Sequence, residues 1–306
     1  MAGATGKHAG ARPPTSRHAG IETLRIAGAF GIVLFHLGGP GAKIGYTALP
    51  LFIFLSVYFA LTARREISLA VFSFSRMQRL LMPWAFWSVV IAGLKILDAL
   101  HENRSISSEF AIWNLLAGPA IHLWFLPYVA ILSIGLRALL PTLERAGPWM
   151  VLPGALAISA AALLSSQRTG LAIPFQQWIF GLPAAIMATS LSLAAKESQI
   201  RVALIWGLFS LVMGFGFLLP DAFRLAATLC MFFAARMLPM PLTPGLRALA
   251  GLTLGVYILH PVIASALQRI GFDIFGGSMF AVVTTFACTA GLTGLLRTLP
   301  KMQRVL

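Results

Sequence analysis

The sequence predicts an all-α, polytopic membrane protein with about ten transmembrane helices. The chain has 306 residues, of which 58 % are hydrophobic and only 10 % are charged. Its mean hydropathy is +0.85, and long apolar windows recur along its length. A water-soluble domain of this size needs many more charged residues to cover its surface. These observations exclude a soluble protein and leave the membrane as the medium in which the chain folds.

Residues 1–20 differ from everything that follows. They are Gly, Ala, Pro and basic residues, without the apolar core of about 7–15 residues that a secretory signal peptide requires. We expect residues 1–20 to form a disordered basic cytoplasmic tail, and residues 21–306 to form one transmembrane domain.

The apolar windows place the helices. A spanning helix needs about 20 apolar residues, so the first long window is divided at the helix-breaking cluster Gly38-Gly39-Pro40-Gly41. The expected spans lie at about 22–38, 47–63, 79–99, 123–140, 150–164, 175–194, 201–219, 222–238, 248–268 and 275–298. The longest connection, at roughly 100–122, is too short to be a domain. The chemistry must therefore lie in the membrane or at its two faces.

The distribution of basic residues predicts the orientation. The net charge of +14 would suggest nucleic acid as the partner of a soluble domain, but here the basic residues lie between apolar windows. With the N-terminus inside, the segments on that side hold sixteen Lys and Arg residues and the opposite segments hold five. By the positive-inside rule we expect both termini in the cytoplasm of a multi-pass protein of the cell (inner) membrane. Membrane lipids, and not nucleic acid, are the expected surroundings.

The first expected helix carries two ionisable residues, Arg25 and His36. Such residues are costly inside a membrane and mark candidate functional sites. They are eleven positions apart, so they share a helix face and lie roughly 16 Å apart along the axis. Without a function, Arg25 would reach the inner interface and pair with Glu22, and His36 would bond a neighbouring carbonyl.

A second basic motif, Arg76-x-x-Arg79, enters the third expected helix from the cytoplasm. At this spacing the two guanidinium groups share a face and can grip a phosphate or diphosphate. Arginines at this position are equally typical of topology determinants and of contacts with lipid headgroups.

Two further histidines lie toward the outer side, His122 beside Trp124, and His260 before Pro261. His122 also fits an interfacial aromatic belt. The three histidines belong to different helices without a carboxylate neighbour, and the two cysteines, Cys230 and Cys288, lie in apolar runs, so no metal site is expected. There is also no Gly-x-Ser-x-Gly motif and no mid-membrane carboxylate for a Ser-His-Asp arrangement.

Taken in order, these segments resemble the integral-membrane acyltransferase 3 family. The parts that carry the resemblance are Arg25 with ten residues before His36, Leu51-Phe-Ile-Phe-Leu-Ser56, the segment Phe74 to Trp87 with Arg76 and Arg79, His122-Leu-Trp-Phe-Leu-Pro127, and Gly255-Val-Tyr-Ile-Leu-His260-Pro261. The family pattern continues after the serine with Gly-Phe, where this chain has Val57-Tyr58. The resemblance covers most of residues 21–262 and implies a stand-alone member without a C-terminal hydrolase-like domain.

The resemblance implies an O-acyltransferase that modifies cell-envelope polysaccharides or similar acceptors. The donor is acyl-CoA from the cytoplasm, commonly acetyl-CoA, and no permanently bound cofactor is implied. Arg25, Arg76 and Arg79 would hold its phosphates. His36 would act as general base or carry the acyl group transiently. The candidates for the pocket of a glycan or lipid-linked hydroxyl acceptor are Ser56, His122, Trp124, Tyr257 and His260.

Two alternatives use the same residues differently. In a glycolipid transporter or flippase the arginines would bind the anionic headgroup and the histidines would line a polar path. A structural subunit of a polysaccharide assembly complex would use them only for stability. The acceptor, the acyl chain and the oligomeric state are not determined by the sequence.

Overall fold

The computed structural model describes residues 18–63, 66–167, 170–274 and 276–306, and within these ranges it is helical without β-strands. The helices run α1 (Ala19–His36), α2 (Ala42–Gly45), α3 (Ala48–Thr62), α4 (Leu69–Arg76), α5 (Met82–His101), α6 (Asn114–Ala117), α7 (Phe125–Ala146), α8 (Pro148–Ser166), α9 (Phe175–Leu193), α10 (Lys196–Gly216), α11 (Pro220–Met237), α12 (Pro244–Gly251), α13 (Thr253–Arg269) and α14 (Met279–Leu296). The all-α prediction is confirmed for the described residues. Residues 1–17 of the expected tail lie outside them, and α1 begins at Ala19.

The helices coincide with the predicted spans, but fewer of them meet a strict test for crossing a membrane. Among the described residues, seven helices are long and apolar enough, or up to eight when α12 and α13, which meet at a bend of 50°, count as one span. The protein is therefore a multi-pass membrane protein. Helix α11 occupies the eighth predicted span but carries Asp221, Arg224 and Arg236. The expected total of ten goes beyond this number and stays a prediction.

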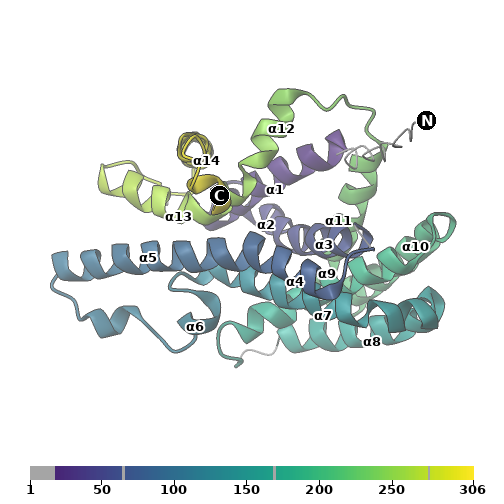
Figure 1. Cartoon of the computed structure of the whole chain (residues 1–306). Coiled ribbons are helices and arrows are strands. Elements are labelled where there is room, and N and C mark those ends of the chain that lie inside the picture. The colour runs from purple at the N-terminus through teal and green to yellow at the C-terminus, as the bar shows by residue number, and fades with distance from the viewer. Residues whose placement is uncertain (1–17, 64–65, 168–169, 275) are drawn as a thin grey trace, which may run out of the picture.

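The core lies mainly between helices α1 to α11. Helix α3 packs against α7 and α9, α8 packs against α9, and α1 packs against α3 and α11 (Figure 1). The side chains of Phe54, Met187, Trp206 and Phe232 are fully buried between them. This block supports α1 along one side and leaves its remaining surface to α12, α13 and α14.

A close approach joins α13 to α14. A Cβ atom at Gly255 would overlap the side chain of Thr293, with Oγ1 only 2.7 Å away. Glycine allows the two helices to meet there because it has no side chain. At the bend before α13, the freed carbonyl of Gly251 accepts a hydrogen bond from Arg297. The end of α14 thus returns to the start of α13.

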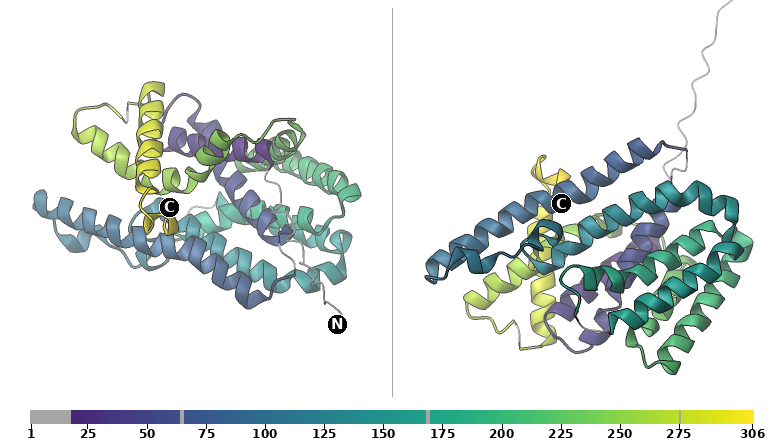
Figure 2. Two further views of the ribbon diagram at one scale, coloured as in Figure 1. Left: turned by 45° about the horizontal axis from the view of Figure 1, so that its top comes forward. Right: turned by 90° about the horizontal axis from the view of Figure 1, so that it is seen from below.

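A π-helical segment, Met77–Leu81, links α4 to α5, and the three form one long helix over Leu69–His101. This helix lies along the edge of the molecule (Figure 2). It begins ten residues before the predicted span at 79–99. The extra length arises because Ser68 caps the start of α4 by accepting a hydrogen bond from the Val71 backbone NH.

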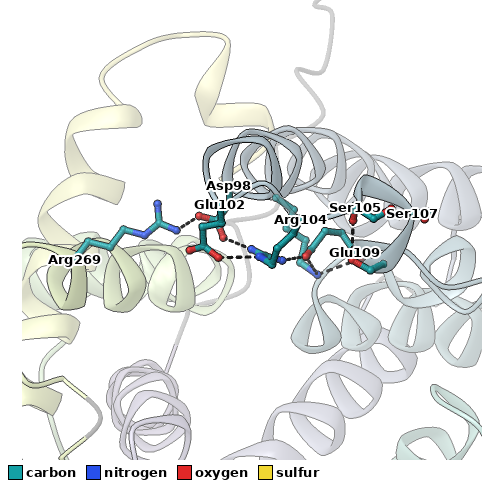
Figure 3. Close-up of polar contacts among 9 residues, drawn as sticks. Asp98, Glu102, Arg104, Ser105, Ser107, Glu109 and Arg269 are labelled. Atoms are coloured by element: carbon teal, nitrogen blue, oxygen red, sulfur yellow. Dashed lines mark hydrogen bonds and ion pairs between the residues drawn. The ribbon is translucent and has the colours of Figure 1, made fainter.

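The connection after α5 is held by a network of ion pairs (Figure 3). Arg104 bonds Asp98 at 2.9 Å, Glu102 at 2.7 Å and also Glu109. Asp98 accepts a second bond from Arg269, the last residue of α13. The network therefore ties the end of α5 both to the following connection and to the end of α13.

Candidate active site

Three histidines from three separate segments meet in the structure. His36 ends α1, His122 lies in the short turn Ile121–Trp124 before α7, and His260 lies within α13. The ring centroids of His36 and His260 are 4.9 Å apart, and those of His122 and His260 are 5.6 Å apart. His122 and His260 are buried, whereas His36 is exposed. We call these three side chains the histidine cluster.

Each ring of the histidine cluster is anchored by one nitrogen to a backbone carbonyl. The pairs are His36 Nδ1 with Ile32 O at 2.9 Å, His122 Nε2 with Ile258 O at 3.1 Å, and His260 Nδ1 with Val256 O at 3.1 Å and Tyr257 O at 2.9 Å. A carbonyl oxygen only accepts, so the nitrogen facing it donates, and in a neutral imidazole the other nitrogen carries a lone pair. In His36 that atom is Nε2, which leaves an unprotonated nitrogen on the exposed residue of the cluster.

Tyr257 supports the cluster from α13. Its hydroxyl donates a hydrogen bond to the backbone carbonyl of His122, and its ring centroid lies 5.9 Å from the His122 imidazole. The turn that carries His122 is thereby fixed to α13. Among the described residues, no group of three or more His, Cys, Asp or Glu side chains is arranged to hold a metal ion.

The other end of α1 borders an open cavity of about 1100 Å³. We call it the arginine cavity, because its lining includes five arginines: Arg25, Arg79, Arg247, Arg297 and Arg304. No Asp or Glu is among the described residues that line it. Such a concentration of guanidinium groups suits a ligand with several negative charges, since arginine binds phosphate oxygens in a bidentate manner.

Arg25 is held in place at the edge of this cavity. It forms an ion pair with Glu22 at 2.9 Å and donates to Thr253 Oγ1 at 3.3 Å. About a third of its side chain remains exposed. The ion pair with Glu22 that a purely structural role predicts is therefore present. Part of the Arg25 side chain nevertheless lines the cavity.

Helix α1 connects the arginine cavity to the histidine cluster. Arg25 lies at one and His36 at the other, eleven residues further, which corresponds to a rise of roughly 16 Å. Helix α13 accompanies α1 in the same direction, because Thr253 contacts Arg25 and His260 contacts His36. The arginine cavity and the histidine cluster thus lie at the two ends of one pair of packed helices.

Comparison with known proteins places the chain in a family. A family model described as an acyltransferase domain, acyltransferase 3, matches residues 18–296. The match covers most of the chain and includes α1 through α14. The chain belongs to the acyltransferase 3 family. It is an acyl-transferring enzyme of the membrane, and the resemblance seen in the sequence is confirmed. No curated protein and no solved structure gave a match in the corresponding comparisons.

The two arginines of the Arg76-x-x-Arg79 motif take different positions in this acyltransferase. Arg79 lines the arginine cavity. Arg76 does not, and its guanidinium carbon lies 5.1 Å from the ring centroid of Phe72. The π-helical segment at Met77–Leu81 has more residues per turn than an α-helix, so residues three apart no longer share a face. Of the two side chains that the spacing predicted to act together, only Arg79 thus borders the arginine cavity.

The remaining predicted residues differ in how they relate to the histidine cluster. Trp124 is buried and packs against Tyr128, with ring centroids 5.4 Å apart. Ser56 is half-buried on α3, and no hydrogen bond of the described structure connects it to the histidines. Tyr257 is the predicted pocket residue that joins the cluster directly.

Sequence reasoning missed three arginines of the acyltransferase. Arg247 comes from α12, Arg297 follows α14, and Arg304 lies in the last short turn. All three were counted only as topology signals of the cytoplasmic side. Their expected position on the cytoplasmic side indicates that they could share a surface with Arg25 and Arg79. Nothing in their spacing predicts that the five line one cavity.

Proposed function

We propose that the protein is an O-acyltransferase that moves an acyl group, most simply acetyl, from cytoplasmic acyl-CoA to a hydroxyl on the other side of the cell membrane. The acceptor is a glycan, a glycolipid or a similar envelope molecule. The observation that carries the proposal is the position of Arg25 and His36 on one helix, the first at the arginine cavity and the second in the histidine cluster.

The arginine cavity suits the donor. CoA carries a diphosphate and a further phosphate, and Arg25, Arg79 and Arg297 offer guanidinium groups around one opening. Charge-assisted bonds to phosphate are among the stronger hydrogen bonds in proteins. With its phosphates held there, the pantetheine arm extends along α1 and brings the thioester toward His36.

The histidine cluster suits the chemical step. Nε2 of His36 takes the proton of the acceptor hydroxyl while the hydroxyl oxygen attacks the thioester carbonyl carbon. The carbon–sulfur bond then breaks, and the proton passes from His36 to the departing sulfur. The products are the acylated hydroxyl and CoA with a free thiol, and His36 returns to its starting state.

The proposed direction of transfer requires the arginine cavity to face the cytoplasm. Arg25 at the start of α1 and Arg297 after α14 line the same cavity, as expected when an even number of spans separates them. Helices α1, α5 and α13 all leave this side, since Arg25, Met82 and Leu252 at their starts line the cavity. The far ends of α5 and α13 also meet, where Asp98 bonds Arg269. These three helices are the first, third and ninth of the ten proposed spans, and both termini then lie in the cytoplasm.

The test is release of free CoA thiol from acetyl-CoA by the detergent-purified protein. We expect His36→Ala to lower the rate by about 100-fold or more, the usual contribution of a general base. His101→Ala serves as the matched control, since His101 is exposed at the end of α5. Full activity of His36→Ala would refute the role of His36, and no thiol release by the wild type would refute acetyl-CoA as donor.

A further inference from the structure

One polar atom of the histidine cluster is buried without a partner. His260 is fully buried, and its Nε2 has no hydrogen-bond partner in the described structure. Its Nδ1 donates to the carbonyls of Val256 and Tyr257. In the neutral ring Nε2 is therefore an acceptor that lacks a donor. Buried polar atoms in native proteins nearly always have a partner, so a donor group from outside the chain is expected here.

The cluster itself offers no such donor. His36 and His122 each use their donating nitrogen on a backbone carbonyl, and the hydroxyl of Tyr257 donates to the carbonyl of His122. The atoms that remain are His36 Nε2, His122 Nδ1 and His260 Nε2. All three accept, and within the described part of the chain none of them has a hydrogen-bond partner. A bound molecule that pairs with these nitrogens must donate hydrogen bonds from O–H or N–H groups.

The position of the orphaned nitrogen relates it to the reacting atom. The rings of His36 and His260 are in contact, with centroids 4.9 Å apart, and His36 is the exposed one of the two. A molecule that approaches Nε2 of His36 therefore also comes next to the ring of His260. A single hydroxyl has one proton and satisfies only one of the two nitrogens. Two adjacent hydroxyls satisfy both.

We propose that the acceptor presents a vicinal diol, in which one hydroxyl loses its proton to His36 and its neighbour donates a hydrogen bond to Nε2 of His260. His260 is then a positioning residue that selects hydroxyl pairs and orients the one that reacts. The inference rests on the proposed function, and it specifies the group that the glycan, glycolipid or similar acceptor presents to the site: two neighbouring hydroxyls.

The experiment compares two small probes with the purified protein and acetyl-CoA. Propane-1,2-diol has adjacent hydroxyls. In 1-methoxypropan-2-ol the same secondary hydroxyl is present, but the neighbouring oxygen is methylated and has no proton to donate. The quantity measured is the ratio of ester formed from the diol to ester formed from the ether. A ratio cancels differences in the amount of folded protein.

We expect a ratio of at least tenfold for the wild type. His260→Asn keeps an amide donor near the position of Nδ1 but removes the Nε2 acceptor, and should reduce the ratio to within twofold. His260→Gln places an amide oxygen near the position of Nε2 and should restore part of the preference. His101→Asn, a histidine outside the cluster, should keep the wild-type ratio.

Three outcomes would overturn the inference while leaving the proposed function intact. These are equal rates on both probes, a preference that survives in His260→Asn, or thiol release to water with ester formed from neither probe. A preference that survives in His260→Asn would mean that Nε2 of His260 binds only a structural water. If the wild type releases no thiol under any condition, the donor assignment itself fails. The wild-type comparison needs no variant, so a misfolded His260→Asn does not decide the result.

Discussion

The rings of His36 and His260 are in contact, with centroids 4.9 Å apart, although one residue ends α1 and the other lies in α13, more than 200 residues further along the chain. At the opposite end of the same helix pair, Arg25 donates to Thr253 at 3.3 Å. Helix α13 is therefore as much a part of the site as α1. Changes that disturb the seating of α13 should affect catalysis even where they touch no substrate.

The two arginines of the Arg76-x-x-Arg79 motif should respond differently to substitution. Arg79→Gln removes a guanidinium group from the arginine cavity and should raise the KM for acetyl-CoA by about tenfold or more, since a bond to a charged group contributes about 1.5–3 kcal/mol. Arg76→Gln should cost less, because Arg76 lies over Phe72 outside the cavity. Steady-state kinetics of the two variants checks this. Equal losses would show that both arginines bind the donor.

Arg297 should bind the donor through its phosphates. It donates to the Gly251 carbonyl and also lines the arginine cavity. We expect Arg297→Gln to weaken binding of CoA several-fold, and added salt to weaken binding further in the wild type because exposed charges are screened. Tryptophan fluorescence titration with CoA measures both effects. Arg145→Gln, an exposed arginine at the end of α7, is the matched control. Unchanged affinity of Arg297→Gln would contradict the assignment.

Gly255→Ala should destabilise the protein. The added methyl group overlaps Thr293 across the α13–α14 contact, and overpacking of this kind costs about 1–3 kcal/mol. The second substitution Thr293→Ala removes the overlapping atoms and should recover part of the loss. Gly93→Ala on α5 is the control, since a Cβ there meets nothing within 4 Å. Thermal unfolding in detergent compares the variants, and a stable Gly255→Ala would mean that the helices are further apart.

The ion-pair network around Asp98 should protect the connection after α5 from proteolysis. Asp98→Asn weakens the bonds to Arg104 and Arg269 that hold this segment. We expect faster cleavage between residues 102 and 120 in limited proteolysis of the purified protein. Glu197→Gln on the exposed start of α10 should behave like the wild type. The same rate of cleavage in Asp98→Asn would show that the connection is held by its apolar contacts instead.

The sequence predicted the helices well because a spanning segment is recognised from its own apolar residues. The sequence was less informative where the position of a side chain depends on how its helix is wound and which helices pack against it. The π-helical segment at Met77–Leu81 changes the face on which Arg79 lies, and no periodicity in the sequence indicates it. The span at α11 carries three charged residues, so apolarity alone describes it poorly.

The candidate site was predicted as residues and not as an arrangement. His36 and His260 were selected because ionisable groups in a membrane are costly, but their contact depends on how α1 and α13 pack. Arg247 and Arg304 come from segments distant in the sequence and lack a motif, so only the folded chain shows that they face Arg25. Burial and hydrogen-bond partners likewise appear only in the folded chain, and within the histidine cluster they distinguish Nε2 of His260 from the other ring nitrogens.

The rigid separation of Arg25 and His36 along α1 makes this helix a molecular ruler. A ligand anchored by its anionic end must have an arm that matches roughly 16 Å to place its reactive carbonyl at the imidazole. Fragments that keep only the phosphates would occupy the cavity as inhibitors, and short thioesters without phosphates would reach the histidine unanchored. With the proposed donor, the enzyme would therefore select the length of the arm and require both ends of the molecule at once.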